Sequence, residues 1–456
     1  MRILDGEANA AAAPLAAMRH GELRGWALLA IGSLAMAGAL AVLLLLARTP
    51  GVKELLPWHW ETFFYSALVT HVVFSFVVWY LAMLGALAAM VAPPGGGAIG
   101  RAGLWLALAG AGLLLVPTLA NTAEPSLNNY VPVLIDPLYY AGLGLLAVGV
   151  ALPSARILAS RRVLADPLGF GIAASAACYL VALVCFALAW ALLPADGDAA
   201  NLNERLFWGG GHVLQFANTG MMLALWQALS TRLLGEPAAP DRLYRTAMAW
   251  LVVFTLPAPV FYFMFDVMGY AHRIAFTDLL WYGLTLPPAV MILGLGRVMW
   301  RRRAALPWGD AAFVGLALSL ALFALGGVMG FFLGVGDTRT PSHYHAVISG
   351  VNAALMAAFV AYLLPRLGRP LPAGRLTRRL FWLYGGGQIV FSAGMFLAGA
   401  SGVPRKTGGA DQHLDTLAKQ ITMGVYGLGG ALAVIGGIIF VWLVLRRLLA
   451  RGAKHG

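Results

Sequence analysis

The chain has 456 residues, of which 60% are hydrophobic and only 11% are charged, and its mean hydropathy is +0.79. A soluble protein of this length could not bury so much apolar surface, so we expect an integral membrane protein whose solvent is the lipid bilayer. The net charge of +12 comes from basic residues in short segments between apolar runs. This pattern indicates membrane topology and argues against a nucleic-acid partner.

Apolar runs of about 20 residues predict transmembrane helices, and twelve such runs follow one another along the chain. Their expected limits are 25–47, 61–92, 102–121, 131–153, 168–194, 205–231, 246–266, 274–299, 310–335, 341–365, 380–400 and 420–446. Residues 1–24 and 450–456 are expected to be tails, and residues 25–449 to form a single membrane domain. The predicted fold class is therefore all-α, with twelve transmembrane helices.

The basic residues set the expected orientation, because cytoplasmic loops carry an excess of Lys and Arg. Most of the 31 lysines and arginines fall on one side if the N-terminus lies inside. Both termini are therefore expected in the cytoplasm, with the chain in a bacterial-type inner membrane. The arginine runs Arg301–Arg303 and Arg378–Arg379 are interpreted as topology anchors.

Four of the nine histidines fall inside expected spans, where ionisable side chains are costly and suggest function. They are His71, His212, His343 and His345. Because residues two apart on a helix point about 200° from each other, His343 and His345 can serve two different centres. Alternatively, they are structural residues bonded to nearby carbonyl groups. The other histidines are expected in tails or at helix ends facing the interface: His20, His59, His272, His413 and His455.

Four stretches, in chain order, resemble subunit I of the haem-copper oxidase superfamily, which includes cytochrome c oxidases and nitric oxide reductases. The segment FALGGVMGFFLGVGDTRTPSHYHAVISGV (323–351) resembles the ninth and tenth helices of that family. YSALVTHVVF (65–74) resembles its second helix, and LFWGGGHVLQF (206–216) its sixth. GQIVFSAGMFLAGASGVPRKT (387–407) resembles the eleventh helix and the basic pair that follows it.

The resemblance implies a twelve-helix bundle that holds two haems. It assigns His71 and His345 to a bis-histidine low-spin haem, and His343 to a high-spin haem. His212 would bind a second metal, copper or iron, that faces the high-spin haem.

The same resemblance assigns Arg405 and Lys406 to the haem propionates. The second-metal site departs from the family, in which two further histidines on the seventh helix complete it, because Phe261 and Tyr262 stand at their positions. Copper prefers several nitrogen ligands, so the presence of a second metal is left open.

The expected function is that of a membrane oxidoreductase that passes electrons from the low-spin to the high-spin haem and reduces dioxygen or nitric oxide. His212, Tyr262 and Gln215 are the expected catalytic residues. Proton pumping is not expected, because the predicted spans lack lysine and place their carboxylates near the ends. With no CxxCH motif in the chain, the electron donor is expected to be a partner subunit, a soluble cytochrome or a quinol.

Two other functions remain as alternatives. A copper-less, non-catalytic di-haem protein would act as an electron conduit or as a nitric oxide binder and sensor. A transporter would also suit twelve spans, but its scheme gives the four histidines no partners.

Overall fold

The computed structural model describes residues 13–47, 60–93, 96–405, 407 and 412–450. Eleven helical segments of this described part are long and apolar enough to cross a membrane. They are His20–Leu44, Phe63–Val91, Gly97–Ala120, Pro137–Leu158, Pro167–Ala191, Asp241–Met264, Tyr270–Arg301, Ala311–Phe332, Arg339–Arg366, Arg375–Ala400 and Leu417–Leu449. Each overlaps one of the expected runs.

The remaining expected run, 205–231, lies within the uninterrupted helix α8 (Ala199–Leu234). This helix is not among the eleven segments, because asparagine, glutamine and glycine residues lower its hydropathy. The count of twelve spans stays a prediction.

The described chain divides into two compact units, one formed by Met1–Ala228 and Ala239–Met291 and the other by Leu229–Ala238 and Ile292–Gly456. The elements of the first unit, in chain order, are α1 (Ala13–Ala47), α2 (Trp60–Val72), the π-helical η3 (Val73–Val78), α3 (Trp79–Val91), α4 (Gly97–Ala120), β1 (Glu124–Ser126), β2 (Val133–Ile135), α5 (Pro137–Leu158), α6 (Arg161–Ala165), α7 (Pro167–Ala191), most of α8, α9 (Asp241–Thr255), η4 (Ala258–Val260), α10 (Phe261–Met264) and the first part of α11 (Tyr270–Arg301).

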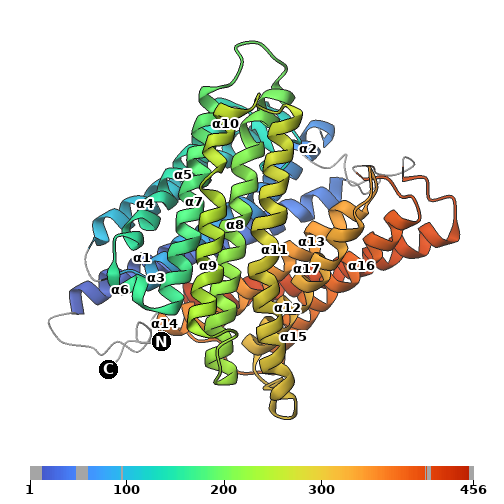
Figure 1. Cartoon of the computed structure of the whole chain (residues 1–456). Coiled ribbons are helices and arrows are strands. Elements are labelled where there is room, and N and C mark those ends of the chain that lie inside the picture. Colours follow the sequence, from blue (N-terminus) through green and yellow to red (C-terminus); the bar gives the residue numbers. More distant parts are fainter. Residues whose placement is uncertain (1–12, 48–59, 94–95, 406, 408–411, 451–456) are drawn as a thin grey trace. The chain divides into compact units, whose positions relative to one another are not determined.

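Close packing of small residues joins α4 and α5, which run alongside each other in Figure 1. A Cβ atom added to Gly110 would lie 2.5 Å from the carbonyl oxygen of Gly142, and Gly103 faces Gly149 in the same way. Any side chain at these positions would separate the helices. Glycine therefore allows the two backbones to approach closely, as is common between membrane helices.

The expected run 131–153 is wrong at its start, because α5 begins only at Pro137. Val133–Ile135 instead forms β2, which pairs antiparallel with β1. Asp136 then caps the helix by accepting a hydrogen bond from the backbone N–H of Leu138 at 2.8 Å, and proline suits the first helical position. An apolar stretch that looks like the start of a span is thus a short strand.

Helix α1 begins at Ala13, inside the expected N-terminal tail, and Glu22 within it is buried. The Glu22 carboxylate forms an ion pair of 3.1 Å with Arg156 of α5, and both side chains are almost inaccessible. A buried charge is tolerated when it is paired in this way. Residues 1–12 and 451–456 of the expected tails lie outside the described residues.

The second unit continues from α11 through η5 (Arg303–Ala305), α12 (Ala311–Met329), η6 (Gly330–Phe332), α13 (Arg339–Ala358), the π-helical η7 (Phe359–Leu363), α14 (Leu364–Arg366), α15 (Arg375–Phe381), the π-helical η8 (Trp382–Gly386), α16 (Gly387–Ala400) and α17 (Leu417–Leu449). Helix α13, which carries His343 and His345, packs against both α12 and α16. Helices α16 and α17 form a further close pair.

Candidate functional site

In the first unit, His71 lies in the last turn of α2, two residues before the π-helical η3 begins. Its Nδ1 atom is 2.8 Å from the carbonyl oxygen of Ala37 on α1. A carbonyl only accepts hydrogen bonds, so Nδ1 carries the proton and the lone pair of the neutral ring is on Nε2. No described residue forms a hydrogen bond to that Nε2 atom.

In the second unit, His343 has the same arrangement. Its Nδ1 atom is 2.7 Å from the carbonyl oxygen of Gly326 on α12, which again leaves the lone pair on Nε2. The preceding residue, Ser342, is buried and donates a hydrogen bond of 2.7 Å to the carbonyl of Ser392 on α16. Contacts with two neighbouring helices therefore fix the position of this histidine.

His345 points away from His343 and contacts a different helix. Its ring centroid is 5.1 Å from that of Phe391 on α16, and the two rings are nearly perpendicular. The ring also lies against the neighbouring Tyr344. The two histidines of the His-x-His motif thus contact different helices, as residues two apart on one helix should.

The loop before α13 is joined to the loop that contains Arg405. The backbone N–H of Arg405 donates to the carbonyl of Gly336 at 3.0 Å, and that of Thr338 donates to the carbonyl of Val403 at 3.2 Å. Asp337 forms an ion pair of 2.7 Å with Arg339. The Arg339 guanidinium lowers the pKa of Asp337, and the charge of Arg405 adds to this effect. Lys406 lies outside the described residues.

Back in the first unit, His212 on α8 is buried and both of its ring nitrogens are engaged. Nδ1 is 2.7 Å from the carbonyl oxygen of Trp208, so this nitrogen donates. Nε2 is 3.0 Å from the hydroxyl of Tyr130 and therefore accepts a hydrogen bond from it. Unlike His71 and His343, His212 has its ring lone pair occupied by another side chain.

Tyr130 reaches His212 from the loop between β1 and β2. Its backbone is in the left-handed region, with φ of 66°. The neighbouring Asn129 holds the loop on α8 by donating from its backbone N–H and its side-chain amide to the two carboxylate oxygens of Glu204, at 2.9 and 2.6 Å. Burial raises the pKa of Tyr130, and the charge of Glu204 raises it further. The phenol is therefore neutral and able to donate.

The glycine run before His212 makes room for its neighbours. A side chain at Gly211 would collide with Tyr130, and one at Gly209 would collide with the hydroxyl of Tyr262. Gly210 is covered in the same way by Phe186. The GGGH motif thus has a steric explanation, because three rings pack directly on the backbone of α8.

Tyr262 of α10 is buried near this site, but it does not bond to His212. Phe276 lies between them, with its ring centroid 5.6 Å from that of His212 and 5.9 Å from that of Tyr262. The structure therefore brings Tyr262 and His212 into one aromatic cluster without joining their polar atoms.

His272 belongs to the same cluster, and the expectation that it faces the interface is wrong. It is 0% exposed, and its ring contacts Tyr262 and Phe276 at centroid distances of 5.1 and 4.9 Å. The turn at Met268, whose φ is 65°, brings the first turn of α11 back over α10. The Nε2 atom of His272 has no hydrogen-bond partner in the described part of the chain.

These contacts do not fit a second metal at His212. Copper or iron would need the lone pair that already accepts the Tyr130 hydrogen bond, and it would need further ligands. Within the described ranges, no group of three or more His, Cys, Asp or Glu side chains is placed to hold a metal ion. His71 and His343, in contrast, donate from Nδ1 to a carbonyl and have no hydrogen bond at Nε2 among the described residues. This fits axial haem ligation, because metal-bound histidines usually donate their other ring N–H to such a group.

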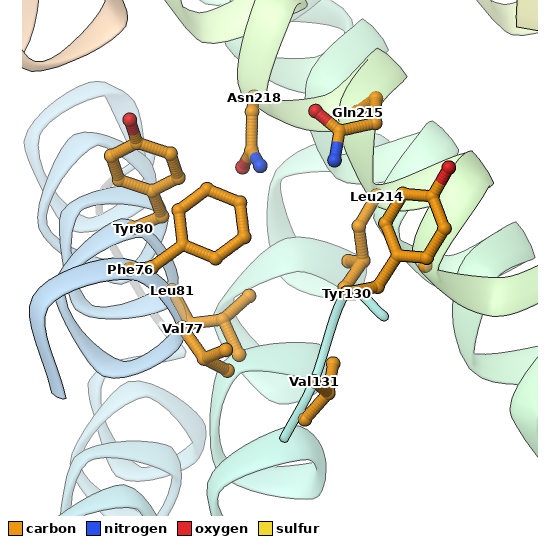
Figure 2. A pocket seen from close by; sticks show the side chains of 10 residues that line it. Phe76, Val77, Tyr80, Leu81, Tyr130, Val131, Leu214, Gln215 and Asn218 are labelled. Atoms are coloured by element: carbon orange, nitrogen blue, oxygen red, sulfur yellow. The ribbon is translucent and has the colours of Figure 1, made fainter. Parts of the chain in front are cut away.

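The side chain of Tyr130 lines a pocket within the first unit (Figure 2). Its empty volume is about 310 Å³. Phe76 and Tyr80 line one side, and the amides of Gln215 and Asn218 line the other. Tyr130 is shared between the pocket and His212. The mostly apolar wall with two amides suits a small, weakly polar ligand.

Sequence reasoning missed Tyr130 and His272. Tyr130 sits in a polar connection between expected spans, and its partner is 82 residues away, so no local pattern links the two. His272 could have been found from its spacing, because it is four residues before Phe276 and shares a helix face with it.

Comparison with known proteins agrees with the fold. The family model of Cytochrome C and Quinol oxidase polypeptide I matches residues 23–441. An uncharacterized protein of Aquifex aeolicus is 29% identical over 360 residues, which cover 74% of this chain and 83% of that protein. Cytochrome c oxidase subunit 1 of Thermus thermophilus is 25% identical over 306 residues, or 59% of this chain and 52% of its own length.

Among solved structures, a heme-copper terminal oxidase dimer determined by cryo-EM is similar, with a TM-score of 0.76 and 16% sequence identity. The match covers 96% of this chain and 85% of that chain. The family match extends over all four motifs and over His71, His212, His343 and His345. The chain therefore belongs to the cytochrome c and quinol oxidase polypeptide I family, the subunit I family of the haem-copper membrane oxidoreductases.

Proposed function

We propose that this chain is a two-haem membrane oxidoreductase that passes electrons from a low-spin haem to a high-spin haem and on to dioxygen or nitric oxide. In this proposal His71 and His345 ligate the low-spin haem, and His343 ligates the high-spin haem. The observation that carries this proposal is that His71 and His343 form the same hydrogen bond, in which Nδ1–H donates to a backbone carbonyl.

That hydrogen bond gives each histidine two properties that an axial ligand needs. It selects the tautomer with the lone pair on Nε2, and it fixes the plane of the ring. When bound, haem supplies the redox chemistry, while the chain sets its axial ligation and the polarity around it. Ala37 and Gly326 act as positioning partners through their carbonyl oxygens.

We further propose that the two basic residues after α16, Arg405 and Lys406, pair with the haem propionates. The side chain of Arg405 is exposed, and its backbone is fixed by the hydrogen bond to Gly336. An exposed guanidinium on a fixed backbone can pair with a carboxylate, which supports this assignment.

In the same proposal the gas binds near Tyr130 and Gln215, with Tyr262 in the adjoining aromatic cluster, and no proton is pumped. The electrons come from a partner subunit, a soluble cytochrome or a quinol, since the chain carries no CxxCH motif of its own.

The contacts of His212 favour a second candidate function, that of a non-catalytic electron conduit or nitric oxide binder. In the family the histidine at this position ligates a second metal, but here its Nε2 atom accepts a hydrogen bond from Tyr130. In this candidate His212 is held by Tyr130 and has no metal to bind.

One set of measurements on the purified chain tests both candidates. We would record absorption spectra of the oxidised and reduced protein with and without carbon monoxide, measure iron and copper, and follow consumption of dioxygen and nitric oxide with an artificial reductant. Two haems, carbon monoxide binding and gas consumption are expected from the first proposal. The same spectra without gas consumption would select the second candidate, and a protein without haem would contradict both.

A further inference from the structure

Three arginines and two tryptophans line a second pocket, which lies wholly within the second unit. They are Arg375, Arg378, Arg379, Trp308 and Trp382. The space in this pocket that a water-sized molecule can enter is about 300 Å³, at the lower end of the range of ~300–1,000 Å³ typical of ligand sites. It involves none of the histidines discussed above.

The positive charge of this pocket has no acidic partner among the described residues. In the part of the chain that the structure describes, no carboxylate forms an ion pair with Arg375, Arg378 or Arg379. Asp310, the acid nearest to Trp308 in sequence, caps α12 by accepting from the backbone N–H groups of Ala312 and Phe313. The three arginines around this concave site are therefore available to bind an anion.

The other arginine run of this unit shows the opposite behaviour. Arg301 and Arg302 both form ion pairs with Glu236, at 3.2 and 3.0 Å. Arg303 lies over the ring of Trp300, with its guanidinium carbon 5.0 Å from the ring centroid. Both runs are interpreted from sequence as topology anchors, but of the two only Arg301–Arg303 includes arginines that form ion pairs among the described residues.

The tryptophans locate the pocket at the level of lipid headgroups. Trp308 is 44% and Trp382 48% exposed, and their rings stack with centroids 5.8 Å apart. Trp308 precedes the candidate span Ala311–Phe332, and the arginines lie at the start of the candidate span Arg375–Ala400. Exposed tryptophans at span ends are typical of the membrane–water interface.

The geometry points to a binding site for the phosphate group of an anionic phospholipid, with the arginines as ligands and the two indole rings against the glycerol region. Guanidinium groups match phosphate oxygens in planar, paired hydrogen bonds. Basic pockets between membrane helices bind such headgroups. The ring positions favour a lipid over a soluble phosphate, which would not need an interfacial aromatic wall.

Native mass spectrometry of the full-length protein, with its haem as purified, tests the site directly. The protein would be titrated with phosphatidylglycerol and, separately, with phosphatidylcholine. We expect the wild type to prefer phosphatidylglycerol. In the variant R375Q/R378Q/R379Q, affinity for phosphatidylglycerol should fall about a hundredfold, since each arginine near an anionic surface contributes roughly fivefold.

The matched control is R301Q/R302Q/R303Q, which removes the same charge from the run that pairs with Glu236 and should retain the preference. An unchanged absorption spectrum shows that each variant is folded. If the triple variant does not fold, the single variant R375Q, at an exposed position, should still lose about fivefold. Equal losses in both triple variants, or no lipid preference in the wild type, would overturn the proposal.

Fluorescence quenching by brominated lipid tests whether the bound lipid lies next to Trp308 and Trp382. The excess quenching of tryptophan fluorescence by brominated phosphatidylglycerol, relative to brominated phosphatidylcholine, should disappear in W308F/W382F and persist in W105F, which changes an exposed tryptophan of the first unit. Complete displacement of phosphatidylglycerol by inorganic phosphate would show that the site takes a soluble anion, and would overturn the lipid assignment.

Discussion

His343 and His212 share a residue type and a hydrogen bond from Nδ1 to a backbone carbonyl, but they differ at the other ring nitrogen. The Nε2 atom of His343 accepts no hydrogen bond within the described chain, whereas that of His212 accepts one from Tyr130. A histidine in a membrane helix is therefore not a metal ligand by position alone. The atom that decides is the nitrogen that carries the lone pair.

The largest expected effect comes from removing the two histidines separately. His343→Ala should lose the carbon monoxide-binding haem, because its axial nitrogen disappears, whereas His212→Ala should retain both haems. Haem content and the reduced carbon monoxide spectrum measure this difference. His413→Ala, at an exposed position, is the control and should resemble the wild type.

Loss of haem from His212→Ala, at a content as low as in His343→Ala, would break the comparison. Free imidazole added to His343→Ala should restore part of the carbon monoxide signal, which separates lost ligation from general unfolding.

The next largest effect is expected from removing the Tyr130 hydroxyl, which donates a hydrogen bond to Nε2 of His212. Tyr130→Phe leaves the buried Nε2 atom of His212 without a donor, so the free energy of unfolding should fall by about 1–3 kcal/mol. Thermal unfolding of the purified protein measures this loss. Tyr270→Phe, in which an exposed hydroxyl is removed, should have no effect. Equal stability of Tyr130→Phe and wild type would show that the hydrogen bond to His212 contributes nothing.

A smaller effect is expected from the contact that holds the Tyr130 loop. Glu204→Gln keeps the size of the side chain but removes its charge, so the bonds from Asn129 weaken. Because this contact is exposed, the loss should be below about 1 kcal/mol. Hydrogen exchange of the loop should rise in Glu204→Gln while that of α13 stays constant. A change confined to α13 would contradict the assignment.

The smallest expected effect is a pH dependence of stability, which comes from the ion pair between Asp337 and Arg339 next to the start of α13. The pKa of Asp337 lies below its ordinary value because Arg339 binds its carboxylate. The stabilisation is therefore complete above the ordinary aspartate pKa of about 3.9, and it is lost as the pH falls through the lowered value. The difference in melting temperature between wild type and Asp337→Asn should shrink below about pH 4. A difference that grows on acidification would have the wrong sign.

The sequence predicts the helical fold well because membrane helices need only long apolar runs, and such runs are visible without knowledge of the partners. It fails at Val133–Ile135, where the same apolar character serves a strand. The motifs also locate His71, His212, His343 and His345. They cannot show which nitrogen of each ring is engaged, because Ala37, Gly326 and Tyr130 come from distant segments. Tyr130 and His272 enter the site only through tertiary contacts.

Substitutions at the three successive glycines before His212 can measure how closely α8 is packed on each of its sides. Alanine at any of them would favour the isolated helix by about 1 kcal/mol, so any loss of stability must come from the neighbour on that side. Gly209→Ala reports on Tyr262, Gly210→Ala on Phe186 and Gly211→Ala on Tyr130. Since three residues nearly complete one turn, this short stretch samples almost the whole circumference of the helix, and its tolerance to a single methyl group maps how tightly each side is closed.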